Sequence, residues 1–114
     1  MKLSTFSHPI NDMAQIVLNP EEDDVDYMVA HQANKMMIDF IVKRLKFDTN
    51  KVPFCISKYG NTSCCSVPLT IVSELEGKMD GVKRLLMTSI GAGWTYASAY
   101  LNTKDLKISP VFDY

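Results

Sequence analysis

Short apolar segments with the character of β-strands alternate along this chain with longer segments of helical period. The clearest helical segment is 32–46, in which apolar side chains such as Met36 recur every three or four positions. Apolar strand-like segments stand before and after it at 25–30 and 52–57, and another lies at 82–90. This alternation predicts a layered α/β architecture whose sheet is parallel at first.

Two further helices are indicated by the residues at their ends. The Ser-His-Pro sequence at 7–9 is typical of a helix start, because proline is tolerated in the first turn. A third helix should begin near Asn61 or Thr62, which are good capping types, and end by residue 77. Pro68 should make the first turn of this helix irregular. Its predicted buried face consists of Val67, Ile71, Val72 and Leu75.

A tight turn in the last quarter of the chain predicts a β-hairpin. The glycine turn at 91–93 joins the strand at 82–90 to a fourth strand at 94–101, so these two strands should pair antiparallel. The full predicted order is α-β-α-β-α-β-β. We assign residues 1–103 to one domain and residues 104–114 to a tail.

The predicted topology gathers three polar or glycine-rich segments at one edge of the sheet. In sheets of this type, ligands bind at the carboxyl ends of the parallel strands. The segments at those ends are 31–34, 58–61 and 90–93. The residues therefore predict a site at this edge, but they do not name a reaction.

Composition argues against several classes of function. The 114 residues are 46% hydrophobic and 22% charged, with a formal net charge of −1, so we expect a packed core and neither nucleic acid nor a membrane as partner. Three cysteines, of which Cys64 and Cys65 are adjacent, are a poor disulfide framework and suit a reducing cytoplasm. Residues 1–11 lack the pattern of a signal peptide, and no His/Cys spacing predicts a metal site.

Three motifs, about 30 residues apart, carry a more specific signal. They are His31-Gln32-Ala33-Asn34, Tyr59-Gly60-Asn61-Thr62-Ser63 and Gly91-Ala92-Gly93-Trp94-Thr95. In this order and spacing they resemble the C-terminal half of β-ketoacyl-acyl-carrier-protein synthase III, a condensing enzyme of fatty-acid synthesis. The resemblance runs from about residue 24 to residue 101, and more weakly back to residue 3.

The resemblance implies a thiolase-like fold of two similar halves and a Cys-His-Asn active site. By position, the histidine is His31 and the asparagine is Asn61, and both donate hydrogen bonds to the thioester carbonyl of malonyl-acyl-carrier protein. Fixed donors of this kind stabilise the enolate that the loss of CO₂ leaves behind. The backbone N–H of Ala92 is implied to help hold a carbonyl oxygen during acyl transfer. The residues implied to bind substrate are Asn34, Gly91 and Gly93.

Each of these residues also has an interpretation without chemistry. His31 at a strand end could cap the next helix, and Asn61 could be an N-cap, with or without a catalytic role. The turn at 91–93 could serve only the hairpin. The presence of all three motifs in order favours the catalytic interpretation.

The nucleophile of the resembled family is absent from this sequence. The family's cysteine belongs to the N-terminal half, where acyl-CoA acylates it, so we expect this chain to be inactive alone. Cys64 and Cys65 follow a predicted helix start, and we interpret them as small buried residues, with a reactive role as the alternative. Cys55 should lie in the core, within a strand.

A missing strand predicts an intimate homodimer. The resembled half begins with a central strand that this sequence lacks, so the strands at 25–30 and 82–90 would close up, take in another copy or leave an exposed edge. Of these outcomes, we expect a domain-swapped or otherwise intimate homodimer.

Basic residues on the segment 32–46 suggest a second partner. Lys43 and Arg44 match positions at which the family meets the acidic acyl-carrier protein. The alternative is a solvated helix face with a Lys35–Asp39–Lys43 ladder.

These inferences describe a fragment of a condensing acyltransferase that joins an acyl-CoA primer to malonyl-acyl-carrier protein, with no cofactor beyond these substrates. One alternative is a non-catalytic module that binds carrier protein or a partner half. Another is a related polyketide-type or alkylquinolone-type synthase, because fold and site residues do not discriminate among these substrates.

Overall fold

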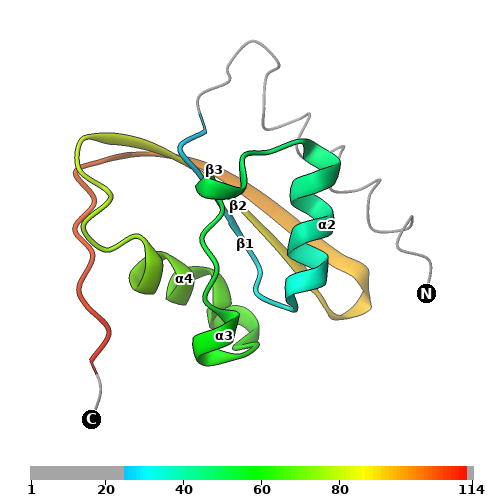
Figure 1. Cartoon of the computed structure of the whole chain (residues 1–114). Coiled ribbons are helices and arrows are strands. Elements are labelled where there is room, and N and C mark those ends of the chain that lie inside the picture. Colours follow the sequence, from blue (N-terminus) through cyan, green and yellow to red (C-terminus); the bar gives the residue numbers. More distant parts are fainter. Residues whose placement is uncertain (1–24, 113–114) are drawn as a thin grey trace.

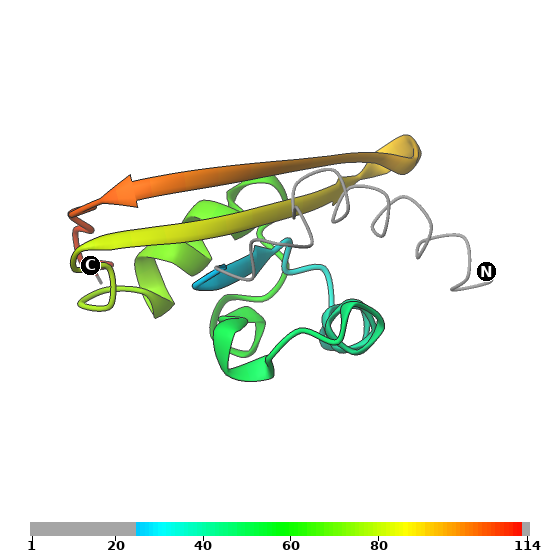
Figure 2. The same cartoon turned by 90° about the horizontal axis from the view of Figure 1, so that it is seen from above.

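The computed structural model describes residues 25–112 of the chain, and the predicted helix that starts at 7–9 lies outside them. Within the described residues, a three-stranded sheet runs through the fold with helices packed beside it (Figure 1, Figure 2). The strands and α-helices in chain order are β1 (Tyr27–Ala30), α2 (Lys35–Leu45), α3 (Ile56–Tyr59), α4 (Ser66–Glu74), β2 (Val82–Gly91) and β3 (Thr95–Lys104). Three 3₁₀ turns lie between them, at Thr49–Lys51, Ser63–Cys65 and Ala92–Trp94.

The sheet has the strand order β1-β2-β3. β1 pairs parallel with β2, from Tyr27 opposite Leu85 to Ala30 opposite Thr88, and β2 pairs antiparallel with β3 along its whole length. The parallel start and the antiparallel hairpin confirm the predicted arrangement. The sequence lacks the strand expected between the segments at 25–30 and 82–90. In the structure these segments, β1 and β2, pair directly with each other, which was the first of the three outcomes considered.

The predicted strand at 52–57 is wrong, because this segment connects a 3₁₀ turn to α3. Pro53 has no N–H to contribute to a ladder. The N–H of Cys55 donates to the side chain of Gln32 (3.1 Å) and not to a neighbouring strand. The apolar composition reflects burial instead, since Phe54 packs against the core cluster beneath α2.

Two core clusters occupy opposite faces of the sheet, because side chains alternate along a strand. On β1, Met28 and Ala30 belong to the cluster that α2 covers, whereas Val29 between them belongs to the cluster beside α4. On β2, Leu86 and Leu85 divide in the same way. β1 and the middle of β2 are thus buried on both faces, which explains the consecutive apolar residues at 27–30 and 85–87.

The helix predicted at 32–46 is confirmed as α2, with a later start. Asn34 is its N-cap, and the Asn34 Oδ1 accepts a hydrogen bond from the Met37 N–H (2.8 Å). Ile41 is buried against the sheet, but Met36 is 71% exposed and falls outside the buried face. The helix therefore buries a narrower stripe than its apolar composition predicts.

α4 departs most from its predicted burial pattern. Its start is irregular, as expected: the 3₁₀ turn Ser63–Cys65 precedes it, and Pro68 lies in its first turn. Of the predicted face, Val67 and Ile71 pack against the core, and Leu75 just beyond the helix is buried. The most buried residues of the helix itself are nevertheless polar, namely Ser66 (1% exposed) and Thr70 (0%).

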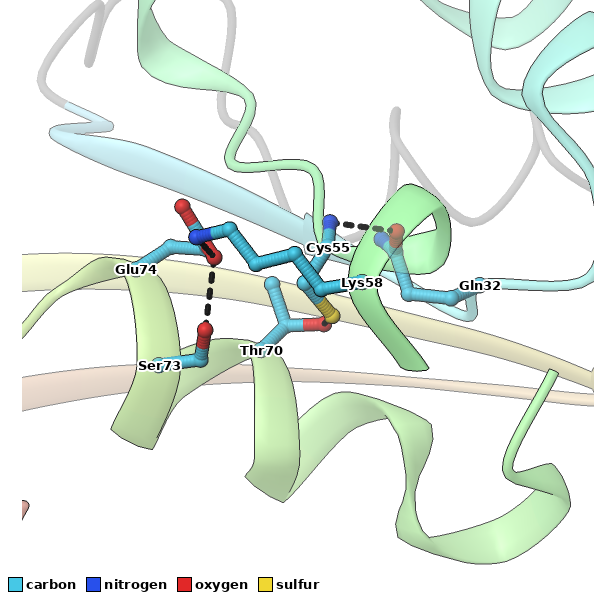
Figure 3. Close-up of polar contacts among 6 residues, drawn as sticks. All are labelled: Gln32, Cys55, Lys58, Thr70, Ser73 and Glu74. Carbon is cyan, nitrogen blue, oxygen red and sulfur yellow. Dashed lines mark hydrogen bonds and ion pairs between the residues drawn. The ribbon is translucent and has the colours of Figure 1, made fainter. Parts of the chain in front are cut away.

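The side chain of Gln32 ties three segments together inside the protein (Figure 3). The Gln32 Nε2 donates to the Ala30 carbonyl (2.9 Å), and the Oε1 accepts from the Cys55 N–H (3.1 Å). The Cys55 Sγ in turn lies 3.1 Å from the Thr70 Oγ1 on α4. Gln32 is 0% exposed, so these bonds have no competition from water.

A second link between α3 and α4 lies nearer the surface. The Lys58 Nζ is 2.6 Å from the Glu74 Oε1, which also accepts a hydrogen bond from Ser73 (Figure 3). Burial raises the pKa of the Glu74 carboxyl, but the hydrogen bonds from Lys58 and Ser73 outweigh this and leave its pKa below the usual value. Because Lys58 is exposed, its ion pair with Glu74 contributes little to stability. The buried hydrogen bonds of the Gln32 amide contribute more.

We predict that Gln32→Leu lowers the free energy of unfolding by about 1–3 kcal/mol, because the buried Cys55 N–H loses its acceptor. Urea unfolding followed by circular dichroism measures the change. Lys35→Ala is the control, since it removes an exposed ion pair with Asp39 and a cation–π contact of 5.6 Å with Phe54, and should cost less than about 1 kcal/mol. Equal stabilities of the two variants would contradict the assigned role of Gln32.

Candidate active site

Two of the three predicted site segments, those at 31–34 and 90–93, lie at the carboxyl ends of β1 and β2. His31 directly follows β1, and its N–H donates to the Thr88 carbonyl on β2 (2.8 Å). β2 runs parallel to β1 and leads into the turn at 91–93, which therefore lies at the same end of the sheet. Asn61 precedes α4, whose first residue, Ser66, contacts His31.

Ser66 is the residue that joins the His31 and Asn61 segments. Its Oγ lies 2.6 Å from the His31 Nδ1 and 3.3 Å from the backbone nitrogen of Gln32. The hydroxyl is buried, and Ser66 at the start of α4 presents it to the Nδ1 edge of the histidine ring. The imidazole is thus held from one side by a fixed hydroxyl.

The contacts of Ser66 favour one tautomer of His31. The Gln32 N–H can only donate, so the Ser66 Oγ accepts from it, and the Ser66 hydroxyl proton needs an acceptor of its own. Within the described structure, the His31 Nδ1 lies at the right distance to accept it. The ring proton then belongs on Nε2, the nitrogen that faces away from Ser66.

The charge state of His31 follows from its burial. Desolvation lowers the pKa of the imidazole below its ordinary value of 6.5. The ring is therefore neutral near pH 7 and presents an uncharged N–H donor.

Asn61 is oriented by a turn of its own and not by a helix cap. Its Oδ1 accepts a hydrogen bond from the Ser63 N–H (2.9 Å), two residues further along the chain. The N-cap of α4 is Cys65, without a side-chain hydrogen bond, so the predicted capping role of Asn61 is wrong. Because a backbone N–H fixes which end of the amide is the oxygen, the Nδ2 is left as a donor on the exposed side of Asn61.

The glycine turn has specific steric requirements. A Cβ on Gly91 would lie 2.8 Å from the Thr95 Oγ1, and Gly93 has a left-handed backbone with φ 71°. The Thr95 hydroxyl donates to the Ala92 carbonyl (3.0 Å) and closes the turn. Thr95 therefore fixes the carbonyl side of Ala92, and the proposed oxyanion role of the Ala92 N–H stays a prediction.

Cys64 and Cys65 are both exposed, so the prediction that they are small buried residues is wrong. The 3₁₀ turn before α4 lifts them away from the core, and their Sγ atoms are 4.0 Å apart. The hydrogen bond from Cys64 raises the pKa of the Cys65 thiol, so Cys65 is a poorer nucleophile at neutral pH than a free cysteine. Cys55 is buried as predicted, although in a loop and not in a strand.

The two predicted docking residues lie at the far end of α2 from the site. Lys43 and Arg44 are exposed in its last turn, whereas Asn34 caps the end next to His31. An 11-residue helix is about 16 Å long, which sets the reach that a carrier-bound substrate arm would need. Of the predicted ladder, Lys35 pairs with Asp39, and no ion pair from Asp39 to Lys43 appears in the described part of the chain.

Residues 25–112 contain no group of three His, Cys, Asp or Glu side chains that could hold a metal ion. None of the helices described is long and apolar enough to cross a bilayer.

Comparison with known proteins identifies the family. The family model described as the C-terminal region of 3-oxoacyl-[acyl-carrier-protein] synthase III matches residues 18–103. The chain belongs to this family. The β-ketoacyl-[acyl-carrier-protein] synthase III of Azobacteroides pseudotrichonymphae is 35% identical over 102 residues, which are 84% of this chain and 30% of that protein.

Solved structures of the synthase III family share the fold. The 3-oxoacyl-(acyl-carrier protein) synthase of Burkholderia xenovorans superposes with a TM-score of 0.85 at 31% identity, over 94% of this chain and 32% of that one. The priming β-ketosynthase of the R1128 polyketide pathway superposes with a TM-score of 0.72 at 31% identity, over 87% of this chain and 31% of that one. The chain thus spans about a third of the length of these relatives and has the fold of their C-terminal part.

Sequence reasoning missed two residues of this synthase III-like site, Ser66 and Gln32. Ser66 and Thr70 stand one helical turn apart within a segment predicted to be apolar on its buried face. Hydroxyl residues four positions apart lie on the same face of a helix, so this pair could have predicted polar side chains on the buried face of α4. Gln32 gave no comparable signal, because its partners come from segments that only the tertiary structure brings near.

We predict that Ser66→Ala shifts the His31 tautomer from Nε2–H toward Nδ1–H. Imidazole ¹⁵N chemical shifts measured near pH 7.5 report this ratio, and His8→Gln removes the other histidine signal. In the parent protein the His31 titration midpoint should lie below 6.5, because burial disfavours the charged ring. Ser73→Ala, on the same helix but bonded to Glu74, is the control and should leave the ratio unchanged. An unaltered ratio in Ser66→Ala would refute the positioning role of Ser66.

Proposed function

We propose that this chain supplies the carbanion-stabilising half of a condensing acyltransferase site, in which an acyl-CoA primer is joined to malonyl-acyl-carrier protein by decarboxylative Claisen condensation. The observation that supports this most strongly is the His31–Ser66 hydrogen bond of 2.6 Å, which favours an imidazole that donates from Nε2. Membership of the synthase III family gives the reaction class.

The proposed chemistry needs two neutral donors at one oxygen. When the bond to the malonyl carboxylate breaks and CO₂ leaves, its electron pair moves into the thioester as an enolate. His31 and Asn61 would donate hydrogen bonds to the enolate oxygen from Nε2 and Nδ2. The enolate carbon then attacks the acyl group on a cysteine thioester, and the cysteine sulfur departs as thiolate.

A neutral histidine suits this step better than a charged one. An imidazolium could protonate the enolate carbon and end the reaction before condensation. Burial, which lowers the pKa of His31, and the Ser66 hydroxyl, which occupies Nδ1, both favour the neutral form. Each preorganised donor of this kind is typically responsible for a 10²–10³-fold acceleration, about 3–4 kcal/mol.

The substrates, the location and the missing nucleophile belong to the same proposal. The cysteine that would carry the primer lies outside this sequence, so we expect the chain alone to release no CO₂ and to make no product. Ala92 would lend a backbone N–H during acyl transfer, and Asn34, Gly91 and Gly93 would line the substrate arm. Acyl-carrier protein and acyl-CoA are the expected partners, in the cytoplasm.

Two alternative functions remain specific enough to test. Similarity to the R1128 priming β-ketosynthase favours a polyketide-type primer as one of them. The exposed basic end of α2 favours a non-catalytic carrier-binding module as the other, because carrier binding needs only Lys43 and Arg44 and not His31.

The proposed reaction predicts a clear result for any longer gene product in which this chain follows a cysteine-bearing segment. Incubated with acetyl-CoA, it should gain one acetyl group by intact mass, and it should then release CO₂ from malonyl-acyl-carrier protein. Asn61→Ala in that protein should lower CO₂ release by about 10²–10³-fold and leave acetylation intact. Asn102→Ala, on the exposed strand β3, is the control and should not change either step. Normal CO₂ release in Asn61→Ala would argue against the enolate role.

Carrier docking predicts a charge-dependent affinity. Replacing Lys43 and Arg44 by Glu should weaken binding of acyl-carrier protein at least tenfold at low salt, and the difference should shrink as salt rises. Calorimetry or fluorescence anisotropy gives the dissociation constants. Replacing the exposed Lys104 and Lys107 by Glu changes the net charge equally and serves as the control. Equal losses in both double variants would indicate a nonspecific charge effect.

A further inference from the structure

Cys64 and Cys65 are two adjacent, exposed thiols that the proposed reaction does not use. Both lie in the 3₁₀ turn Ser63–Cys65, which leads into α4, and their Sγ atoms are 4.0 Å apart. The third cysteine, Cys55, is buried. Redox-sensing cysteines are typically exposed and have a second cysteine nearby that closes a disulfide, and in a reducing compartment such disulfides are usually transient. The pair therefore has the arrangement of a redox site.

The pair lies between the two contacts that orient the proposed donors. On one side, the Ser63 N–H donates to the Asn61 Oδ1 (2.9 Å). On the other side, Ser66 is the next residue along the chain, and its Oγ lies 2.6 Å from the His31 Nδ1. A change in the backbone of the cysteine pair therefore reaches the segments that hold both donors.

The turn that carries the pair combines two backbone hydrogen bonds with two unfavourable features. The Cys65 N–H donates to the Thr62 carbonyl (3.1 Å), and the Ser66 N–H donates to the Ser63 carbonyl. Ser63 has a left-handed backbone with φ 54°, which is costly for residues other than glycine. Within residues 25–112, the buried Thr62 Oγ1 has no hydrogen-bond partner. Other contacts must offset these costs, so a covalent change at the pair can shift the whole turn.

We propose that Cys64 and Cys65 form a redox site that a hydroperoxide oxidises to a disulfide, and that closure of this bond moves Ser66 away from His31. Adjacent Cα atoms are about 3.8 Å apart across a trans peptide, shorter than the roughly 4.4–6.8 Å usual for a disulfide. The two sulfur atoms must also approach from 4.0 Å to about 2.0 Å. Closure therefore requires new backbone dihedral angles at the pair, and Ser66 moves with them. A bond closed under such strain is easily reduced, so the modification is reversible.

The chemistry balances with the hydroperoxide as the only co-reactant. The Cys64 thiolate attacks one peroxide oxygen and becomes a sulfenic acid, while the O–O bond breaks and the other oxygen takes up the thiol proton and leaves as water or an alcohol. The Cys65 sulfur then attacks the Cys64 sulfur, the S–O bond breaks, and hydroxide leaves as water with the Cys65 proton. Two electrons pass from the sulfur atoms to the peroxide. The contact with Cys64 raises the pKa of the Cys65 thiol, which suits Cys65 to the second attack.

Thiol counting and peptide mapping test the closure. A small excess of hydrogen peroxide should reduce the free thiols, counted after unfolding, from three per chain to one, without a covalent dimer. The tryptic peptide 59–78 contains Cys64 and Cys65 without Cys55. In the oxidised chain this peptide should be lighter by about 2 Da and resist alkylation, and dithiothreitol should restore both properties. Cys65→Ser, which keeps one thiol of the pair, is the control and should show no such loss of mass.

The tautomer ratio of His31 tests the consequence for the site. In the His8→Gln background, oxidation should shift the imidazole ¹⁵N signals from Nε2–H toward Nδ1–H, as Ser66→Ala does. Dithiothreitol should reverse the shift, which separates it from methionine oxidation, because methionine sulfoxide is restored by dedicated reductases. Reduced Cys65→Ser should show the parent ratio, which also shows that this variant is folded, and peroxide should leave its ratio unchanged.

Three outcomes would each overturn this redox site. They are three free thiols after oxidation, a disulfide that includes Cys55 or links two chains, and closure that leaves the His31 ratio unchanged. The measurements use this chain alone and no acyl substrate, so they do not depend on the acyl-transfer chemistry.

Discussion

The buried amide of Gln32 is the contact on which the rest of the arrangement depends. A short parallel strand such as β1 ends in exposed peptide groups, and something must bond them where the chain turns away. Gln32 does so at the Ala30 carbonyl and, with its other end, holds the Cys55 N–H of a loop from a later part of the chain. Because Cys55 also contacts Thr70, a single side chain fixes α4 against the end of β1.

The position of α4 then determines the chemistry of His31. Ser66 is the first residue of α4, and its hydroxyl reaches the histidine only because the helix starts at the end of β1. The backbone N–H of Gln32 donates to the same hydroxyl and turns its proton toward the imidazole. Fold and function thus share the same two residues: Gln32 places the helix, and Ser66 on that helix orients the donor.

The sequence predicted those parts of the fold that depend on local periodicity. The helix α2, the parallel β1, and the hairpin of β2 and β3 follow from patterns within single segments. The false strand at 52–57 shows the limit of such patterns, since an apolar run reports burial and not a ladder, and Pro53 and the Gln32 contact decide its structure. The predicted cap at Asn61 failed because a turn to Ser63 takes its side-chain oxygen first.

The proposed hydrogen-bond donors of the candidate site differ in how well their neighbours fix their positions. His31 is fixed by a buried hydroxyl, and Asn61 is fixed by its own turn, so the pair that would stabilise an enolate is organised within this chain. Ala92 lies in an exposed turn at the start of the uncovered strand β3, closed by Thr95 alone. In the proposed reaction, acyl transfer would therefore depend on whatever covers that turn, whereas the two proposed enolate donors are each oriented by contacts within residues 25–112.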